Sequence, residues 1–386
     1  MTKEKTPFLF FAQPDIGNEE ISEVVDTLKS GWLTTGPKTS RFENDFSKFI
    51  NAPYSLAVNS ATAGLHLSLE AIGISPGDQV ITTPYTFTAS AEVIRYLGAD
   101  PVFVDIDSRT FNMDPEKIEA AITLRTKAII PVHFSGQACD MPRIMEIARQ
   151  YRLRVIEDAA HALPTSCRGK MVGTIGDTTV FSFYVTKTLA TGEGGMVVTS
   201  SEKIAKRIKT MRLHGINRDI WDRYTAKKPN WYYEVVAPGF KYNMSDIIAA
   251  IGINQLKKNE QFQKRREMIA HRYNKAFAQL PLQTPYVAHP EDTHAWHLYV
   301  VQLELEKIRF SRNEFIEKMA EQGIGTSVHF IPLHLQPYWR DRYGFKPEDF
   351  PVALDCYQRA VSLPIYSKMS DDGVERVINA VREILK

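Results

Sequence analysis

Two segments of the chain combine residue types that could support covalent chemistry with a carbonyl compound. Lys187 stands in a loop of small and polar residues, 186–195, between two short apolar runs. A lysine held at the edge of a buried sheet loses solvation, which lowers the pKa of its amine and makes it a Schiff-base nucleophile. Asp158 follows another apolar run and precedes His161. Most lysines are simply solvated, and Asp158 could equally cap a helix, so neither segment decides the chemistry alone.

A third segment, 59–64, is a turn of small residues that leads into an expected helix. The free backbone N–H groups at such a helix start favour an anion, for example a phosphate. Taken by itself, the segment is more simply explained as an ordinary N-cap by Ser60 or Thr62. Together, however, the carboxylate, the helix start and the lysine match the needs of a cationic ring nitrogen, a phosphate and an aldehyde.

An α/β fold would bring these segments to one edge of a sheet. Apolar runs alternate with longer amphipathic stretches, which predicts βα units in a largely parallel sheet with its chemistry beyond the carboxyl ends of the strands. The last two expected strands nearly abut, so we expect them to be antiparallel. The expected strands are 55–59, 79–82, 101–105, 128–133, 154–157, 179–182 and 195–199, and the expected helices between them are 62–71, 88–97, 115–121 and 141–151.

The length of the chain, 386 residues, predicts more than one compact core. A long charged helix should start near Ser245, after which the alternation loosens, and residues from about 290 are typical of a smaller α+β unit. We therefore expect a large domain at residues 1–250 and a smaller C-terminal domain at 251–386. Because no Pro- or Gly-rich linker separates them, the two domains should be closely packed.

Composition argues against several classes of protein. Forty-seven Lys and Arg against 45 Asp and Glu give a net charge of +2, which provides no overall attraction to nucleic acid or to an anionic membrane. Three scattered cysteines suggest no disulfide framework and fit a reducing cytoplasm. The pairs His294 with His297 and His329 with His334 lack a carboxylate or thiolate at ligand spacing, so we expect no metal site. No G-x-G-x-x-G follows the first expected strand, which argues against a nicotinamide-dependent enzyme.

The order and spacing of these segments resemble the DegT/DnrJ/EryC1/StrS family of sugar aminotransferases, which belong to fold type I of the pyridoxal-phosphate enzymes. The resemblance rests on Asp-Ala-Ala-His-Ala at 158–162 together with Phe-Ser-Phe-x-x-Thr-Lys at 181–187, a pairing more specific than any single glycine pattern. Matching stretches at 31–37, 81–88, 240–244 and 329–334 extend it over essentially the whole chain. It implies an α/β large domain with a mixed, mostly parallel seven-stranded sheet flanked by helices, plus a smaller C-terminal α+β domain.

The resemblance also implies a cofactor, pyridoxal 5′-phosphate (PLP), which alternates with pyridoxamine 5′-phosphate (PMP). Lys187 would form the internal aldimine and later shuttle a proton, and Asp158 would keep the pyridinium nitrogen protonated. His161 stands where the family has Gln or His near the phenolic oxygen. The resemblance assigns the other cofactor contacts to Phe87 on the ring face, to Ala61, Thr62 and Ser182 at the phosphate, and to Asn243 from the neighbouring subunit of a homodimer with shared active sites.

The expected reaction has two halves, in which glutamate donates its amino group to the cofactor and a nucleotide-linked keto-sugar then receives it. His329 and Arg218 would contact the substrate, and His334 and Trp296 lie in segments that approach it in the family. The stretches 212–216 and 231–234 are most similar to the branch that aminates C4 of UDP-linked 4-keto sugars, so a UDP- or dTDP-4-keto-6-deoxy sugar is expected. Such amino sugars serve cell-surface polysaccharides, glycans or secondary metabolites.

Three alternatives stay open beside this interpretation: an enzyme for C3 keto-sugars, a cyclitol aminotransferase, and a non-catalytic regulatory member of the family. A regulatory member should have lost Lys187 or Asp158, and this chain keeps both. A relative that removes oxygen from sugars would carry histidine in place of Lys187. Tyr184 and Val185 stand where His-Pro is frequent in the family, and Thr188 where Asn is frequent, which leaves the wall around Lys187 undefined.

Overall fold

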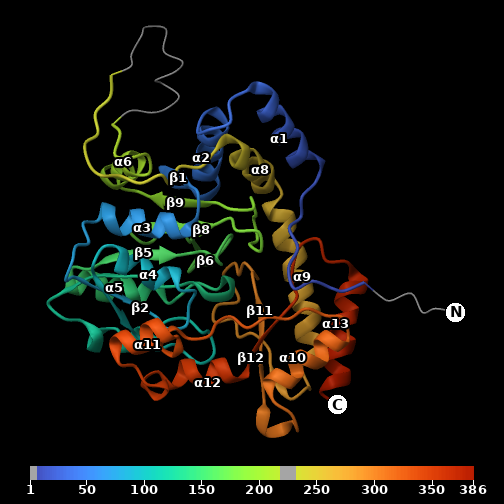
Figure 1. Ribbon diagram of the computed structural model, residues 1–386. Coiled ribbons are helices and arrows are strands. Elements are labelled where there is room, and N and C mark those ends of the chain that lie inside the picture. The colour runs from blue at the N-terminus through green and yellow to red at the C-terminus, as the bar shows by residue number, and fades with distance from the viewer. Residues whose placement is uncertain (1–6, 218–231) are drawn as a thin grey trace.

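The computed structural model describes residues 7–217 and 232–386. At its centre lies a seven-stranded sheet with helices on both faces (Figure 1). One strand, β9, is antiparallel to both of its neighbours, β1 and β8, and the other pairs are parallel. The expected mixed, mostly parallel sheet of an α/β fold is therefore confirmed. In spatial order the strands are β1 (Tyr54–Val58), β9 (Gly195–Thr199), β8 (Thr178–Ser182), β5 (Arg154–Asp158), β4 (Thr126–Ile129), β2 (Gln79–Thr82) and β3 (Asp100–Phe103).

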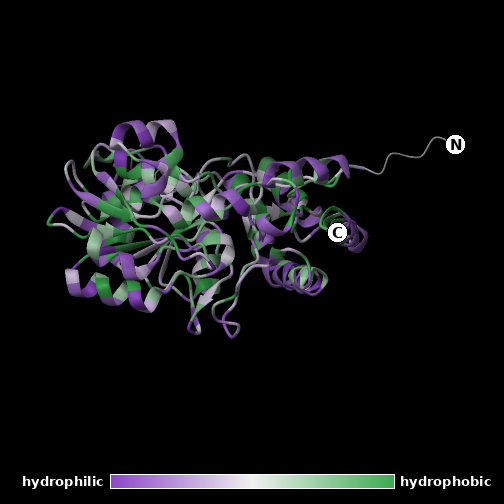
Figure 2. Ribbon diagram, turned by 90° about the horizontal axis from the view of Figure 1, so that it is seen from below, coloured by the Kyte–Doolittle hydropathy of each residue, from purple (hydrophilic) through white to green (hydrophobic). Residues whose placement is uncertain are grey.

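Each face of the sheet is buried under its own set of helices, because alternate strand residues point to opposite faces. Val58, Val180 and Val197 meet the helices of one face, whereas Phe181 and Val198 meet those of the other. In Figure 2 the hydrophobic colour is concentrated on the strands and the hydrophilic colour on the outer turns of the helices. The first face carries α3 (Ala61–Ala71), α4 (Ala89–Tyr96) and α6 (Glu202–Met211), and the second carries α2 (Pro37–Ile50), α5 (Met141–Tyr151) and α8 (Asp246–Lys257), with α1 (Asn18–Ser30) against α8.

The C-terminal part forms a smaller α+β unit with its own apolar core. Its long helix α9 (Asn259–Phe277) packs with a three-stranded antiparallel sheet and two further helices. A second apolar cluster joins Phe103 and Phe134 of the large unit to Leu298 and Trp339, so the two units are closely packed as expected. The division at residue 250 stays a prediction. The other α-helices and strands within the described ranges are β6 (Ser166–Cys167), β7 (Lys170–Met171), β10 (Leu282–Gln283), β11 (Tyr299–Leu303), α10 (Arg312–Glu321), α11 (Pro337–Tyr343), α12 (Pro351–Arg359), β12 (Ala360–Leu363) and α13 (Asp371–Ile384).

Several expected elements are shorter than the apolar pattern indicates, among them the strand expected at 101–105, which ends at Phe103, and the helix expected at 88–97, which spans Ala89–Tyr96. Residues 115–121 form two 3₁₀ turns rather than one helix, because only Ile118 of this segment is buried and so short a helix gains little from packing. The strand expected at 128–133 ends at Ile129, since Pro131 has no N–H to donate to the ladder. Within the described ranges, no helix has both the length and the apolar character that crossing a membrane requires.

Candidate active site

The start of α3 lies directly on β9 and forms a cradle of backbone groups at the sheet edge. Gly195 pairs with Val58 on one side and with Ser182 on the other. A Cβ atom at Gly195 would lie 2.7 Å from the carbonyl carbon of Ser60 and 2.8 Å from the nitrogen of Ala61. Only glycine allows this approach, which brings the first turn of α3 next to the end of β8.

This cradle suits a phosphate group. The side chain of Ser60 caps α3 by accepting a hydrogen bond from the nitrogen of Ala63. The N–H groups of Ala61 and Thr62 belong to the first turn, where a helix offers no internal acceptor, and the helix dipole adds positive potential. The hydroxyl of Ser182 lies at the end of the strand paired with Gly195. The structure thus brings three of the expected phosphate contacts to one place.

Asp158 ends β5 and presents a buried, oriented carboxylate. Its side chain lies in the interior, with the whole residue 5% exposed. The Ser90 hydroxyl donates to Oδ2 at 2.7 Å, and the backbone N–H of Ala160 donates to Oδ1 at 3.1 Å. These two donors hold the carboxylate in one orientation, in which it can pair with a protonated ring nitrogen.

Lys187 projects from the loop after β8 toward the same edge of the sheet. Loss of solvation lowers the pKa of its amine to about 8, and the charge of Asp158 opposes this shift. The amine nitrogen Nζ lies 3.4 Å from Nε2 of His297. A lysine with this lowered pKa has a larger neutral fraction near neutral pH than an ordinary lysine, and a Schiff-base nucleophile needs the neutral amine.

His161 lies beside Lys187, and its protonation is fixed by the backbone. The N–H of Ser135 donates to Nδ1 of His161 at 3.3 Å, so in the neutral ring the proton is on Nε2. Burial and the charge of Lys187 lower the pKa of His161 well below its usual value, which keeps the ring neutral. His161 therefore offers an N–H donor, the group that a phenolic oxygen would need.

Two other expected cofactor residues lie at the rim rather than in the interior. Phe87 is 60% exposed, with its ring centroid 6.1 Å from that of Phe330. Asn243 bridges to Val58 through its backbone and donates from its side chain to Thr35 Oγ1 at 2.7 Å. Stacking by Phe87, and the approach of Asn243 to the phosphate of a neighbouring subunit, stay predictions.

The expected substrate residues are divided by the structure. His329 is buried near Lys187. Burial and the charge of the Lys187 amine lower the pKa of His329 to about 4. Trp296 and His334 are packed in the interior, where Trp296 stacks on His294 and His334 contacts Phe350. These two side chains support the fold around the site. Arg218 lies outside the described residues.

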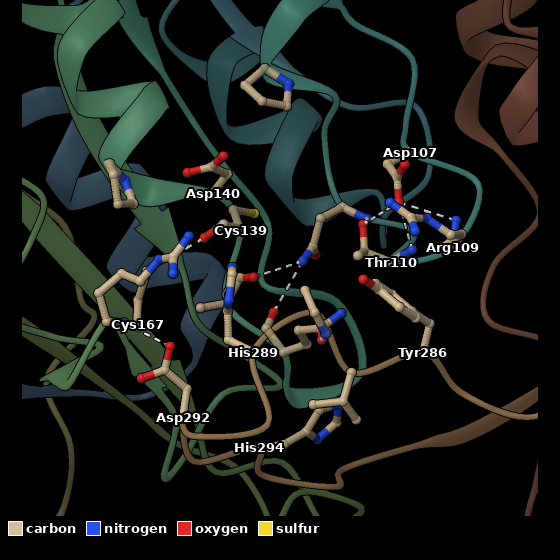
Figure 3. A pocket seen from close by; sticks show the side chains of 18 of the residues that line it. Asp107, Arg109, Thr110, Cys139, Asp140, Cys167, Tyr286, His289, Asp292 and His294 are labelled. Atoms are coloured by element: carbon tan, nitrogen blue, oxygen red, sulfur yellow. Dashed lines mark hydrogen bonds between the residues drawn. The ribbon is translucent and has the colours of Figure 1, made fainter.

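A cavity of about 390 Å³ lies next to this site but is distinct from it (Figure 3). Arg109 stands over the ring of Tyr286 at its border, and Asp292 lies near Cys167 on another side. The segments 135–137 and 294–298 form the shared wall, since Gln137 and His294 line the cavity whereas Ser135 and His297 contact the site. Neither Asp158 nor Lys187 is among its lining residues.

Comparison with known proteins matches the whole chain to one family. The family model described as the DegT/DnrJ/EryC1/StrS aminotransferase family matches residues 14–382. The spore coat polysaccharide biosynthesis protein SpsC of Bacillus subtilis (strain 168) is 52% identical over 388 residues, which cover 100% of this chain and 99% of SpsC. The protein MJ1066 of Methanocaldococcus jannaschii is 56% identical over 374 residues, covering 97% and 96% of the two chains.

Solved structures agree in fold and include forms with the cofactor. Spr1654 of Streptococcus pneumoniae, described as a sugar aminotransferase, aligns in its PMP form with a TM-score of 0.90 and 35% identity, covering 98% of this chain and 97% of that one. Its PLP form aligns with a TM-score of 0.89 and 34% identity, covering 98% of this chain and 100% of that one. PseC of Helicobacter pylori, an aminotransferase involved in pseudoaminic acid biosynthesis, gives 0.89 and 28%, covering 98% and 99%. The chain belongs to the DegT/DnrJ/EryC1/StrS aminotransferase family and is a PLP-dependent aminotransferase of fold type I.

Proposed function

We propose that this enzyme transfers the amino group of glutamate to C4 of a nucleotide-linked keto-sugar, a UDP- or dTDP-4-keto-6-deoxy sugar, in the cytoplasm. The observation that carries the catalytic part is the position of Lys187, whose amine has a lowered pKa and lies close to Asp158 and His161. The names of SpsC and PseC, which refer to polysaccharide and pseudoaminic acid biosynthesis, support a sugar substrate.

The residues of the site divide the work of holding the cofactor. The first-turn N–H groups of α3 and the hydroxyl of Ser182 would bind its phosphate. Asp158, oriented by Ser90, would pair with the ring nitrogen and keep it protonated, and Nε2 of His161 would donate to the phenolic oxygen. Bound in this way, PLP supplies an electron sink for the carbon that loses or gains a proton.

Lys187 would carry out the proton transfers in both halves of the reaction. In the first half its neutral amine would take the α-proton of glutamate and give it up to C4′ of the cofactor, and in the second half Nζ would take a proton from C4′ and deliver it to the sugar carbon that receives the amino group. The surrounding protein excludes water from the amine, which lowers its pKa from 10.5 to about 8. Such a group both accepts and donates protons readily near neutral pH.

A homodimer with shared active sites is part of this proposal. Helix α1 exposes Ile21, Val25 and Leu28, which are 55%, 40% and 52% accessible in the single chain. Three apolar side chains on one exposed helix are typical of a surface that a second chain covers. In such a dimer Phe87 would stack on the cofactor ring, and Asn243 would contact the cofactor phosphate in the site of the neighbouring subunit.

The substrate assignment is tested by supplying UDP- and dTDP-4-keto-6-deoxy sugars with glutamate and locating the new amino group by NMR. We expect amination at C4 and a matching amount of 2-oxoglutarate. Amination only at C3, or only of a cyclitol ketone, would refute the C4 assignment and leave the aminotransferase chemistry intact. Complete inactivity of a PLP-loaded protein toward every amino donor would favour a regulatory role instead.

A further inference from the structure

We infer that His297 is a positioning residue for Lys187: its ring holds the lysine amine whenever that amine is not bonded to the cofactor. The contact joins Nζ of Lys187 to Nε2 of His297 at 3.4 Å, across 110 residues of sequence. This inference rests on the proposed catalytic role of Lys187. The inference gives a role to His297, which is not among the residues that would bind the cofactor ring or its phosphate.

The ring of His297 is fixed from several directions. It lies 4.4 Å from the ring of His161, measured between centroids. The buried guanidinium of Arg266 on α9 donates to the carbonyl oxygens of Trp296 at 3.1 Å, His297 at 3.4 Å and Ile365 at 2.9 Å. Trp296 itself has a left-handed backbone, with φ of 48°. Such a conformation persists only where its surroundings hold it, so the approach to Lys187 is imposed by the fold.

The protonation of the ring suits an acceptor. Burial and the nearby groups Lys187, His161, Arg266 and His329 all lower the pKa of His297 well below its usual value, so the ring is neutral. When Lys187 is protonated, its ammonium donates to Nε2, and the ring proton is then on Nδ1. Asp158, at the end of the neighbouring strand β5, is the carboxylate whose charge acts on Lys187.

The other ring nitrogen, Nδ1, forms no hydrogen bond within the described residues that would account for an imidazole at this position. Nδ1 is buried and has no hydrogen-bond partner in the described part of the chain. A buried polar atom without a partner lowers stability, so an apolar side chain would make a more stable core here. The chain keeps an imidazole at this cost, and the only polar contact of its ring among the described residues is with Lys187.

Two conservative variants separate this role from simple packing. In His297→Gln the side-chain amide reaches the position of Nε2, whereas in His297→Asn it reaches only the position of Nδ1. His297→Leu removes both nitrogens and fills the space. His294→Asn is the matched control, because His294 lies three residues away, faces the neighbouring cavity, and uses Nδ1 to accept from the nitrogen of Trp296.

The test is competitive acetylation of Lys187 by acetic anhydride in the full chain cleared of cofactor, followed over pH by mass spectrometry. In the native protein, the midpoint of the plot of Lys187 acetylation against pH should lie at about 8. Loss of the acceptor in His297→Leu should lower it by about one pH unit, because a hydrogen bond to a charged donor contributes about that much. His297→Gln should restore the native midpoint, His297→Asn should not, and the control should leave it unchanged.

The loaded enzyme gives a second readout. His297→Leu and His297→Asn should lower kcat about tenfold or more with little change in the KM for glutamate, since they misplace the lysine rather than the donor. An unchanged midpoint in His297→Leu, or equal behaviour of the Gln and Asn variants, would overturn the inference. If the proposed role of Lys187 is wrong, the native protein will lack a Lys187-dependent visible band, whatever the acetylation midpoints are.

Discussion

Substitution of Gly195 by alanine tests whether the start of α3 binds the cofactor phosphate. The added Cβ would lie 2.7–2.8 Å from backbone atoms of Ser60 and Ala61, well inside ordinary contact distance. Because these neighbours are backbone rather than flexible side chains, the first turn of α3 must move by about 0.6–0.7 Å to restore contact at 3.4 Å. A shift of this size misaligns the N–H groups that face the phosphate.

The cost should appear mainly in cofactor affinity. Weakening hydrogen bonds to a charged group by about 2–3 kcal/mol in total raises the Kd for PLP roughly 30- to 160-fold. The free energy of unfolding should fall by about 1–3 kcal/mol because the substitution overpacks a fitted contact. Both quantities can be measured, the first by fluorescence titration of the apo chain and the second by thermal unfolding.

A matched control separates the two effects. Val198→Ala removes two buried methyl groups from the same strand, away from the cradle, and should cost about 2 kcal/mol of stability with PLP affinity unchanged. Pyridoxal, which lacks the phosphate, should bind native protein and Gly195→Ala equally well. Equal weakening of PLP and pyridoxal, or native PLP affinity in Gly195→Ala, would refute the assignment of the phosphate to this cradle.

Three further predictions concern the other parts of the site. The rate at which the apo chain captures PLP should rise with pH and level off above about pH 8, because only the neutral amine of Lys187 adds to an aldehyde. A rate that stays constant from about pH 6 to 10 would contradict the lowered pKa of Lys187. Because the Ser90 hydroxyl orients Asp158, Ser90→Ala should lower kcat/KM about tenfold, whereas Ser90→Thr should retain most of the native kcat/KM. Equal activity of the two variants would contradict this role of the hydroxyl. Mixing equal amounts of inactive Lys187→Ala and Asn243→Ala chains should restore about one quarter of the native activity if Asn243 serves the partner's site, because half of the dimers are then mixed and each of these has one intact site. No restoration would show that the sites are not shared.

The sheet and the main site residues could be predicted from the sequence because both depend on local patterns. Strands β2 and β9 have the expected bounds, since turn residues flank each apolar run. Asp158 and Lys187 lie at the ends of neighbouring strands, and the topology of a parallel sheet brings such ends together. The family pattern then pointed to the same two residues.

The support around these residues could not be predicted, because it depends on packing between distant segments. Ser90 contacts Asp158 across 68 residues, and His297 contacts Lys187 across 110. The sequence gives one hint, the spacing of His294 and His297, but this pair alone predicts neither a metal site nor a contact with Lys187. In the structure the two rings face opposite sides of one wall. Gly195 is a similar case. Position 195 must be glycine because α3 lies directly on β9, and this contact can be seen only in the structure.

The central claim, that Lys187 binds PLP covalently and is needed for the bound cofactor to take the amino group of glutamate, is tested most directly by the visible absorption spectrum of the purified protein with PLP, before and after glutamate. The native protein should show a yellow band that glutamate bleaches, and Lys187→Ala should fail to form that band. A native protein with no band in the presence of PLP, or a Lys187→Ala variant with the same band and the same bleaching, would contradict the account.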